Sequence, residues 1–167
     1  MSDVYSEIMV KRITPASDKV KKGALIGGTA VCLAAGIVFY PPLLIAAVIL
    51  GVVTYLMLPR FDLEFEYLYV NGEIDIDKIM GKQKRKRCAS YDIENMEILA
   101  PSNSHALDSY KNNRDIRVKD YTSLDPQAPS YSLVFNQESR RELVKLELNE
   151  KVVGDIRRIA PRKVCQY

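Results

Sequence analysis

One uninterrupted run of 36 residues without charge constrains this chain more than any other feature. Residues 23–58 contain no Asp, Glu, Lys, Arg or His, so all 24 basic and 21 acidic residues lie elsewhere. A soluble domain does not gather so many apolar residues in one run, whereas about 20 of them form one membrane-spanning helix. The run therefore predicts membrane-embedded structure and argues against a wholly soluble single domain.

Two adjacent prolines, Pro41 and Pro42, interrupt this run near its centre. A proline inside a helix removes a backbone hydrogen bond and costs about 3 kcal/mol, and lipid offers no water to replace that bond. We therefore expect two helices, about 23–39 and 43–58, joined by a short turn. Each is roughly 25 Å long, slightly short of a ~30 Å hydrocarbon core. A re-entrant hairpin and a buried soluble hairpin are the alternatives.

Basic residues flank the uncharged run on both sides and are absent from its central turn. Five precede the run, and Arg60, Lys78 and a basic cluster from Lys82 follow it. Because positively charged flanks stay in the cytoplasm, we expect a two-span protein of the cell membrane with both termini cytoplasmic. The segment 4–13 is expected to form a short helix on the inner membrane surface.

Small residues recur at four-residue steps along both expected helices. Such spacing lets two helix backbones approach closely. The favoured interpretation is that the two helices of one hairpin pack on each other, and the alternative is a face for a homo-oligomer or another protein partner. The residues concerned are Gly23, Gly27, Gly28, Cys32, Gly36, Ala47 and Gly51.

After the run, apolar and polar residues alternate, as in half-buried strands. Asn71-Gly72 fits a hairpin turn, and Asn149 fits the N-cap of an amphipathic helix that ends before Pro161. We expect a cytoplasmic N-terminal segment (1–22), a two-helix hairpin (23–58) and one small cytoplasmic domain (59–167). The seven expected antiparallel strands lie near 61–69, 73–79, 85–90, 93–99, 116–121, 130–136 and 143–148.

Residues that commonly carry enzyme chemistry are few and scattered. His105 is the only histidine, and Cys32, Cys88 and Cys165 show no regular spacing. The chain has no CxxC, HExxH, GxSxG or GxxxxGK[ST] motif, so we expect no metal site, no cofactor and no catalytic residue. An enzyme is the least favoured class of function.

One short cluster, which we call the basic run, stands out from an otherwise acidic domain. Lys82, Lys84, Arg85, Lys86 and Arg87 carry five positive charges, whereas the rest of 59–167 has 14 basic and 18 acidic residues. Beside a membrane, each such cation gains about 1 kcal/mol from anionic headgroups. The run therefore predicts lipid contact, and a solvated charged sheet edge is the alternative. No nucleic-acid partner is expected, because no aromatic residues interleave with the run.

Five segments together resemble a known family: VYSEIMVKR, the uncharged run, EFEYLYVNGEIDIDKIMGKQKRKRC, VKDYTS and LVKLELNEKVVGDIRRIAPRKV. The chain is similar to small bacterial two-span membrane proteins that carry a PH-like domain after a helical hairpin and have no assigned activity. This resemblance implies a mainly-β PH-like barrel closed at one end by the C-terminal helix.

The expected function is a membrane-anchored, non-catalytic binding or scaffold module on the cytoplasmic face. Its partners would be anionic lipid headgroups or another protein. The alternative is an accessory subunit of a larger membrane complex, in which the spans supply the contacts.

Overall fold

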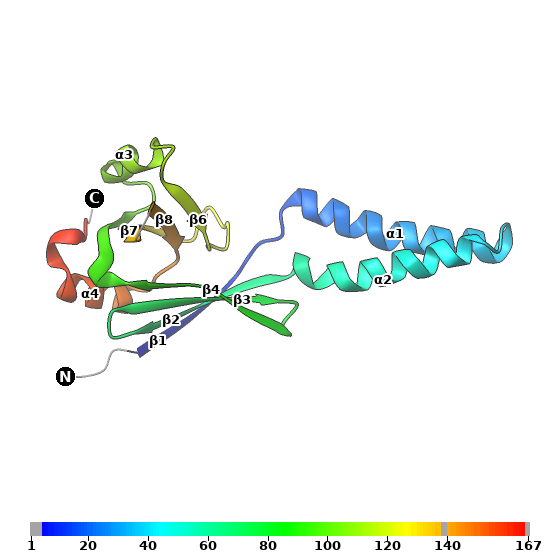
Figure 1. Ribbon diagram of the computed structural model, residues 1–167, viewed down its shortest axis with the longest axis horizontal. Helices are drawn as coiled ribbons and strands as arrows, with labels where there is room; N and C mark the ends of the chain where they lie inside the picture. Colours follow the sequence, from blue (N-terminus) through cyan, green and yellow to red (C-terminus); the bar gives the residue numbers. More distant parts are fainter. Residues whose placement is uncertain (1–4, 138–139, 166–167) are drawn as a thin grey trace. The chain divides into compact units, whose positions relative to one another are not determined.

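The structure is a computed structural model that describes residues 5–137 and 140–165. The chain forms two compact units, which are described separately. The hairpin unit comprises residues 13–63 and 79–85, and the sheet unit comprises 1–12, 64–78 and 86–167. Figure 1 shows the elements of both units.

Two helices, α1 (Ala16–Val38) and α2 (Leu43–Phe61), make up most of the hairpin unit. The expected turn at Pro41-Pro42 is confirmed, because α2 begins directly after it. α1 begins seven residues earlier than expected, at Ala16. The expected start was placed at the first residue of the uncharged run. The helix instead begins directly after Pro15, and an ion pair between Asp18 and Lys21 (3.1 Å) supports its charged first turns.

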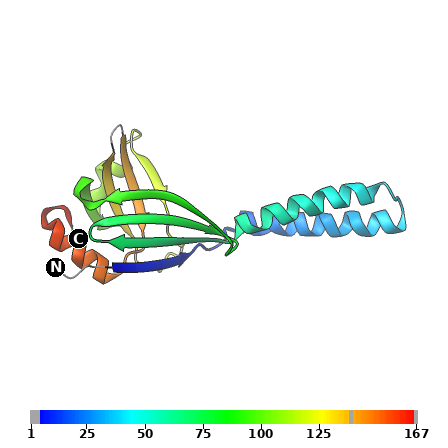
Figure 2. The ribbon, with the colours of Figure 1, turned by 60° about the horizontal axis from the view of Figure 1, so that its bottom comes forward.

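Two four-stranded sheets form the body of the sheet unit, and α4 (Glu150–Ile159) lies at one end of them (Figure 2). The first sheet has the order β1-β2-β3-β4, with β1 (Tyr5–Lys11), β2 (Leu63–Val70), β3 (Glu73–Met80) and β4 (Lys84–Asp92). The second has the order β5-β7-β8-β6, with β5 (Met96–Pro101), β7 (Tyr131–Gln137), β8 (Arg140–Leu146) and β6 (Arg117–Asp120). The short helix α3 (Asp108–Lys111) precedes β6.

The expected single barrel of seven antiparallel strands is wrong in its count, its layout and one strand direction. All seven expected strands exist, but they lie in two sheets. Residues 5–11 of the segment expected as an interfacial helix form an eighth strand in the described part of the chain, β1. β6 pairs with β8 in parallel, with Arg117 beside Glu142. A short apolar pattern does not distinguish helix from strand, and strand direction depends on partners distant in the sequence.

The strands β1 and β2, which the helical hairpin separates in the sequence, pair with each other through seven residue pairs. The pairing is antiparallel and runs from Tyr5↔Val70 to Lys11↔Glu64. Ser6 and Val10 of β1 are buried beneath it. The chain segments that enter and leave the hairpin are therefore neighbours in one sheet.

The core of the sheet unit is built from both sheets and from α4. Tyr91 of β4 stacks on Phe135 of β7 with ring centroids 4.5 Å apart. Val152 and Ile156 of α4 are fully buried in the same cluster, which contributes about 1.5–3 kcal/mol for each side chain. The predicted N-cap is confirmed, since Asn149 Oδ1 accepts a hydrogen bond from the Val152 N–H at 2.9 Å.

Three tyrosines place their hydroxyl groups on acceptors inside this core. Tyr67 donates to the Tyr121 carbonyl and Tyr69 to Asp155 Oδ2, both at 2.6 Å, and Tyr91 donates to Glu142 Oε2 at 2.9 Å. Burial raises the pKa of each of these phenols well above its usual range. A charged phenolate is therefore strongly disfavoured in the folded state.

We expect the protein to lose stability steeply above pH 10. Phenols with a raised folded-state pKa give stability that is fully present below the ordinary value of 10.0 and is lost as the pH rises above it. Each contributes a slope of at most about 1.4 kcal/mol per pH unit. Thermal melting of the full chain in detergent from about pH 8 to 11 measures this slope. Tyr91→Phe should make it shallower, and an unchanged slope would contradict the assignment.

Candidate functional site

Complementary small and polar side chains hold the two helices of the hairpin together. Thr29 and Thr54 share a hydrogen bond between their Oγ1 atoms at 3.2 Å, and Thr29 also donates to the Leu25 carbonyl at 2.7 Å. A Cβ atom at Gly36 would lie 2.9 Å from the backbone nitrogen of Leu44. The favoured role of the small residues in packing the hairpin is therefore seen at Gly36, while oligomerisation stays a prediction.

The open end of the hairpin, opposite the proline turn, is held together by hydrogen bonds to backbone carbonyls. Thr14 Oγ1 donates to the Phe61 carbonyl at 3.1 Å, and the Gly81 N–H donates to the Asp62 carbonyl at 2.8 Å. Gly81 has φ +56°, and a Cβ there would lie 2.7 Å from Pro59 Cβ. Glycine at this position therefore lets the β3–β4 turn pack on the end of α2.

Positive charge is concentrated at this open end. The hairpin unit carries seven basic and two acidic residues, a net charge of +5, and none of them lies within residues 23–58. The sheet unit, in contrast, has 17 basic and 19 acidic residues, a net charge of −2. We call the seven cations the basic collar: Lys19, Lys21, Lys22, Arg60, Lys82, Lys84 and Arg85.

The structure divides the predicted basic run between the two units. Lys82, Lys84 and Arg85 belong to the hairpin unit, whereas Lys86 and Arg87 belong to the sheet unit. All five side chains are exposed. Arg87 forms an ion pair with Asp75 of the neighbouring strand β3. Three residues of the run are therefore brought to the hairpin end, and Arg87 is engaged within the sheet.

The other four members of the collar lie next to the uncharged run in the sequence. Lys19, Lys21 and Lys22 lie in the first two turns of α1, and Arg60 lies in the last turn of α2. Their signal in the sequence is their position beside the uncharged run. The β3–β4 turn lies at the same end of the hairpin as these four residues because Gly81 packs against the end of α2.

Other groups capable of chemistry have structural partners or stand alone at the surface. His105 is fully exposed and contacts Asp108 at 3.0 Å. Lys119 Nζ lies 2.7 Å from Glu142 Oε2 and 3.2 Å from the Tyr91 hydroxyl, which braces β4, β6 and β8. Burial raises the pKa of the Cys88 thiol. Among the described residues, no cluster of three His, Cys, Asp or Glu side chains suits a metal ion.

Gly81→Ala should destabilise the protein, because alanine is strained at positive φ and its Cβ would meet Pro59. The strain alone costs about 1–2 kcal/mol. Gly154→Ala is the matched control. Gly154 lies inside α4, and a Cβ there would meet no atom within 4 Å in the described structure. It should stabilise the helix by roughly 1 kcal/mol.

Thermal melting of both full-length variants in the same detergent measures the difference. A Gly81→Ala protein that melts at or above the temperature of the unaltered protein would show that the turn does not depend on glycine.

Comparison with known proteins identifies one matching family. The family described as "Bacterial PH-like domain (DUF6106)" matches residues 2–166, nearly the whole chain. No curated protein and no solved structure matches the chain. The match therefore supports the PH-like architecture and names no reaction.

Proposed function

The chain belongs to the bacterial PH-like domain family, and we propose that it is a membrane-anchored binding module without catalytic activity. In this proposal, the helical hairpin inserts in the bilayer and the sheet unit lies in the cytoplasm. The exposed apolar surface of the hairpin, with all its charge at one end, is the observation that carries the proposal.

Both helices are long and apolar enough to cross a membrane. Their most apolar stretches have mean hydropathies of 1.4 in α1 and 2.1 in α2, and only 6% and 11% of these stretches are buried. Ile37, Phe39 and Tyr55 each expose more than two thirds of their surface. Water penalises exposed apolar area by about 25 cal/mol per Å², so a bilayer is the environment that suits this surface. A buried soluble hairpin would have its apolar side chains covered by protein.

The β1–β2 ladder supports a hairpin topology with both flanks on one side. Strand pairing between residues 5–11 and 64–70 requires the two flanks of the hairpin to meet in one compartment. Basic residues of the collar lie at this same end, and cytoplasmic segments carry the excess of Lys and Arg. We therefore place both termini in the cytoplasm.

Two measurements on the full chain test insertion and topology. The protein should remain in the membrane pellet after alkaline carbonate extraction, because the apolar spans hold it there rather than surface charge. Phe39→Cys, in a chain with the three native cysteines changed to Ala, should react with a membrane-impermeant maleimide added outside intact cells.

A matched cysteine at Lys111, in the sheet unit, should react only after the cells are opened. Extraction into the supernatant would contradict insertion, and protection of position 39 would favour the re-entrant hairpin. Labelling of position 111 in intact cells would show that the sheet unit lies outside the cell and that the proposed orientation is wrong.

The basic collar gives this anchored module a second contact with the membrane. We propose that Lys82, Lys84 and Arg85 bind anionic headgroups, because their turn packs on the end of α2. The other collar residues flank the spans directly. At about 1 kcal/mol for each cation near an anionic surface, the three turn residues together contribute an appreciable preference for anionic lipid.

Lipid preference can be measured by native mass spectrometry of the full chain in detergent, titrated with phosphatidylglycerol or phosphatidylcholine. The unaltered protein should prefer phosphatidylglycerol, and Lys82→Gln/Lys84→Gln/Arg85→Gln should weaken that preference by about tenfold or more. The control Lys111→Gln/Lys145→Gln/Arg162→Gln removes the same charges from the sheet unit. Equal losses in the two triple variants would show a general charge effect and contradict a specific role for the turn.

A further inference from the structure

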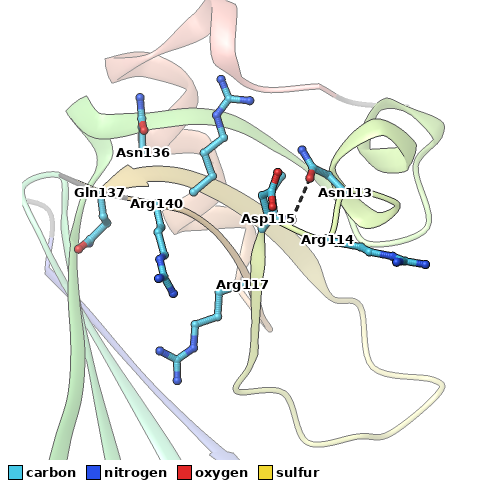
Figure 3. Close-up of a pocket in the computed structure, with 9 residues that line it drawn as sticks. Asn113, Arg114, Asp115, Arg117, Asn136, Gln137 and Arg140 are labelled. Carbon is cyan, nitrogen blue, oxygen red and sulfur yellow. Dashed lines mark hydrogen bonds between the residues drawn. The ribbon is translucent and has the colours of Figure 1, made fainter.

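The sheet unit contains a polar hollow that is separate from the basic collar. Its volume is ≈ 970 Å³, in the upper part of the range for small-molecule sites. Two segments distant in the sequence line it: residues 113–117, which lead from α3 into β6, and the facing ends of β7 and β8 (Figure 3). We call it the arginine hollow, because it is lined by Arg114, Arg117, Arg140 and Arg141.

Positive charge in the arginine hollow is only partly balanced by protein carboxylates. Asp115 is the single acidic residue among its described lining residues. Arg141 is paired with Glu97, with 3.3 Å between its guanidinium nitrogen and Oε1. Across residues 5–137 and 140–165, Arg117 and Arg140 form no ion pair. Within the described lining, four arginines and a single carboxylate leave a net positive charge, which favours the binding of an anion.

The carboxylate nearest to Arg117 in the strand ladder is already engaged. Glu142 is the parallel-register neighbour of Arg117. Its Oε2 atom accepts the Tyr91 hydroxyl at 2.9 Å and lies 2.7 Å from Lys119 Nζ. The brace engages Glu142, whose side chain is largely buried, whereas Arg117 is exposed.

The orientation of the side chains distinguishes two of the arginines. In Figure 3, Arg117 and Arg140 extend in the same direction, whereas Arg114 points away from them. Asn136 and Gln137, at the end of β7, add neutral amide donors to the lining. Guanidinium groups present rigid, paired N–H donors that match the oxygens of a phosphate.

We propose that the arginine hollow binds a phosphate-bearing anion, with Arg117 and Arg140 donating to the phosphate oxygens. A phosphate monoester carries close to two negative charges at neutral pH. A phosphodiester headgroup carries one, so both kinds of anion are attracted to these two arginines. The polar lining does not suit an apolar ligand. The phosphate comes either from a soluble phosphorylated compound or from a lipid headgroup. This site does not depend on the membrane role of the hairpin.

The proposal can be tested by isothermal titration calorimetry of the full chain in a neutral detergent at low salt. Sodium pyrophosphate is the soluble probe, and monomeric dihexanoyl phosphatidylglycerol is the lipid probe. Arg117→Gln/Arg140→Gln should weaken binding by about tenfold or more, since two charge-assisted contacts are lost. Lys111→Gln/Arg162→Gln removes the same net charge outside the hollow and should bind with nearly unaltered affinity.

The two probes separate the two sources of phosphate. Saturable pyrophosphate binding that depends on Arg117 and Arg140 supports the site with a soluble ligand. The same dependence seen only with the lipid probe supports the site with a headgroup ligand. Equal affinities of the two double variants for both probes, or saturable binding of neither probe by the unaltered protein, would overturn the proposal. Melting temperatures close to that of the unaltered protein confirm that both variants are folded.

Discussion

Strand pairing between β1 and β2 is the interaction on which the architecture of this protein depends. Seven residue pairs join segments that are separated in the sequence by the whole helical hairpin. Loop-closure entropy grows only slowly with loop length, and here the intervening residues are themselves ordered as two packed helices. The ladder completes the first sheet and buries Ser6 and Val10. It also requires the two flanks of the hairpin to meet, which is why a membrane role for the hairpin implies one compartment for both.

The two compact units also differ in net charge. The hairpin unit has a net charge of +5 and the sheet unit a net charge of −2. Gly81 is central to this division, because its close contact with Pro59 holds the cationic β3–β4 turn at the end of α2. The proposed headgroup contact and the proposed phosphate site therefore use different cations, on different units, and can be tested independently.

The elements that could be predicted are those whose signals are local. Pro41-Pro42 marked the turn between the helices, and Asn149 marked the start of α4. The seven later strands follow from alternation and turn residues. The basic run was recognised as a cluster, but its division after Arg85 was not foreseen, because it depends on which residues pack against α2. The arginine hollow was missed altogether, since Arg117 and Arg140 are separated by a long loop and a strand.

Solvation is what the amino-acid sequence determined by itself: 36 residues without charge, broken by two prolines, specify an apolar hairpin wherever the rest of the chain folds. Tertiary structure decided that residues 5–11 form a strand, that β6 runs parallel to β8, and that arginines from two distant segments line one hollow. The physical reason is the distance along the sequence over which each interaction acts. Hydropathy, capping and turn formation act between near neighbours, whereas strand partners and charge clusters arise only when distant segments share a core.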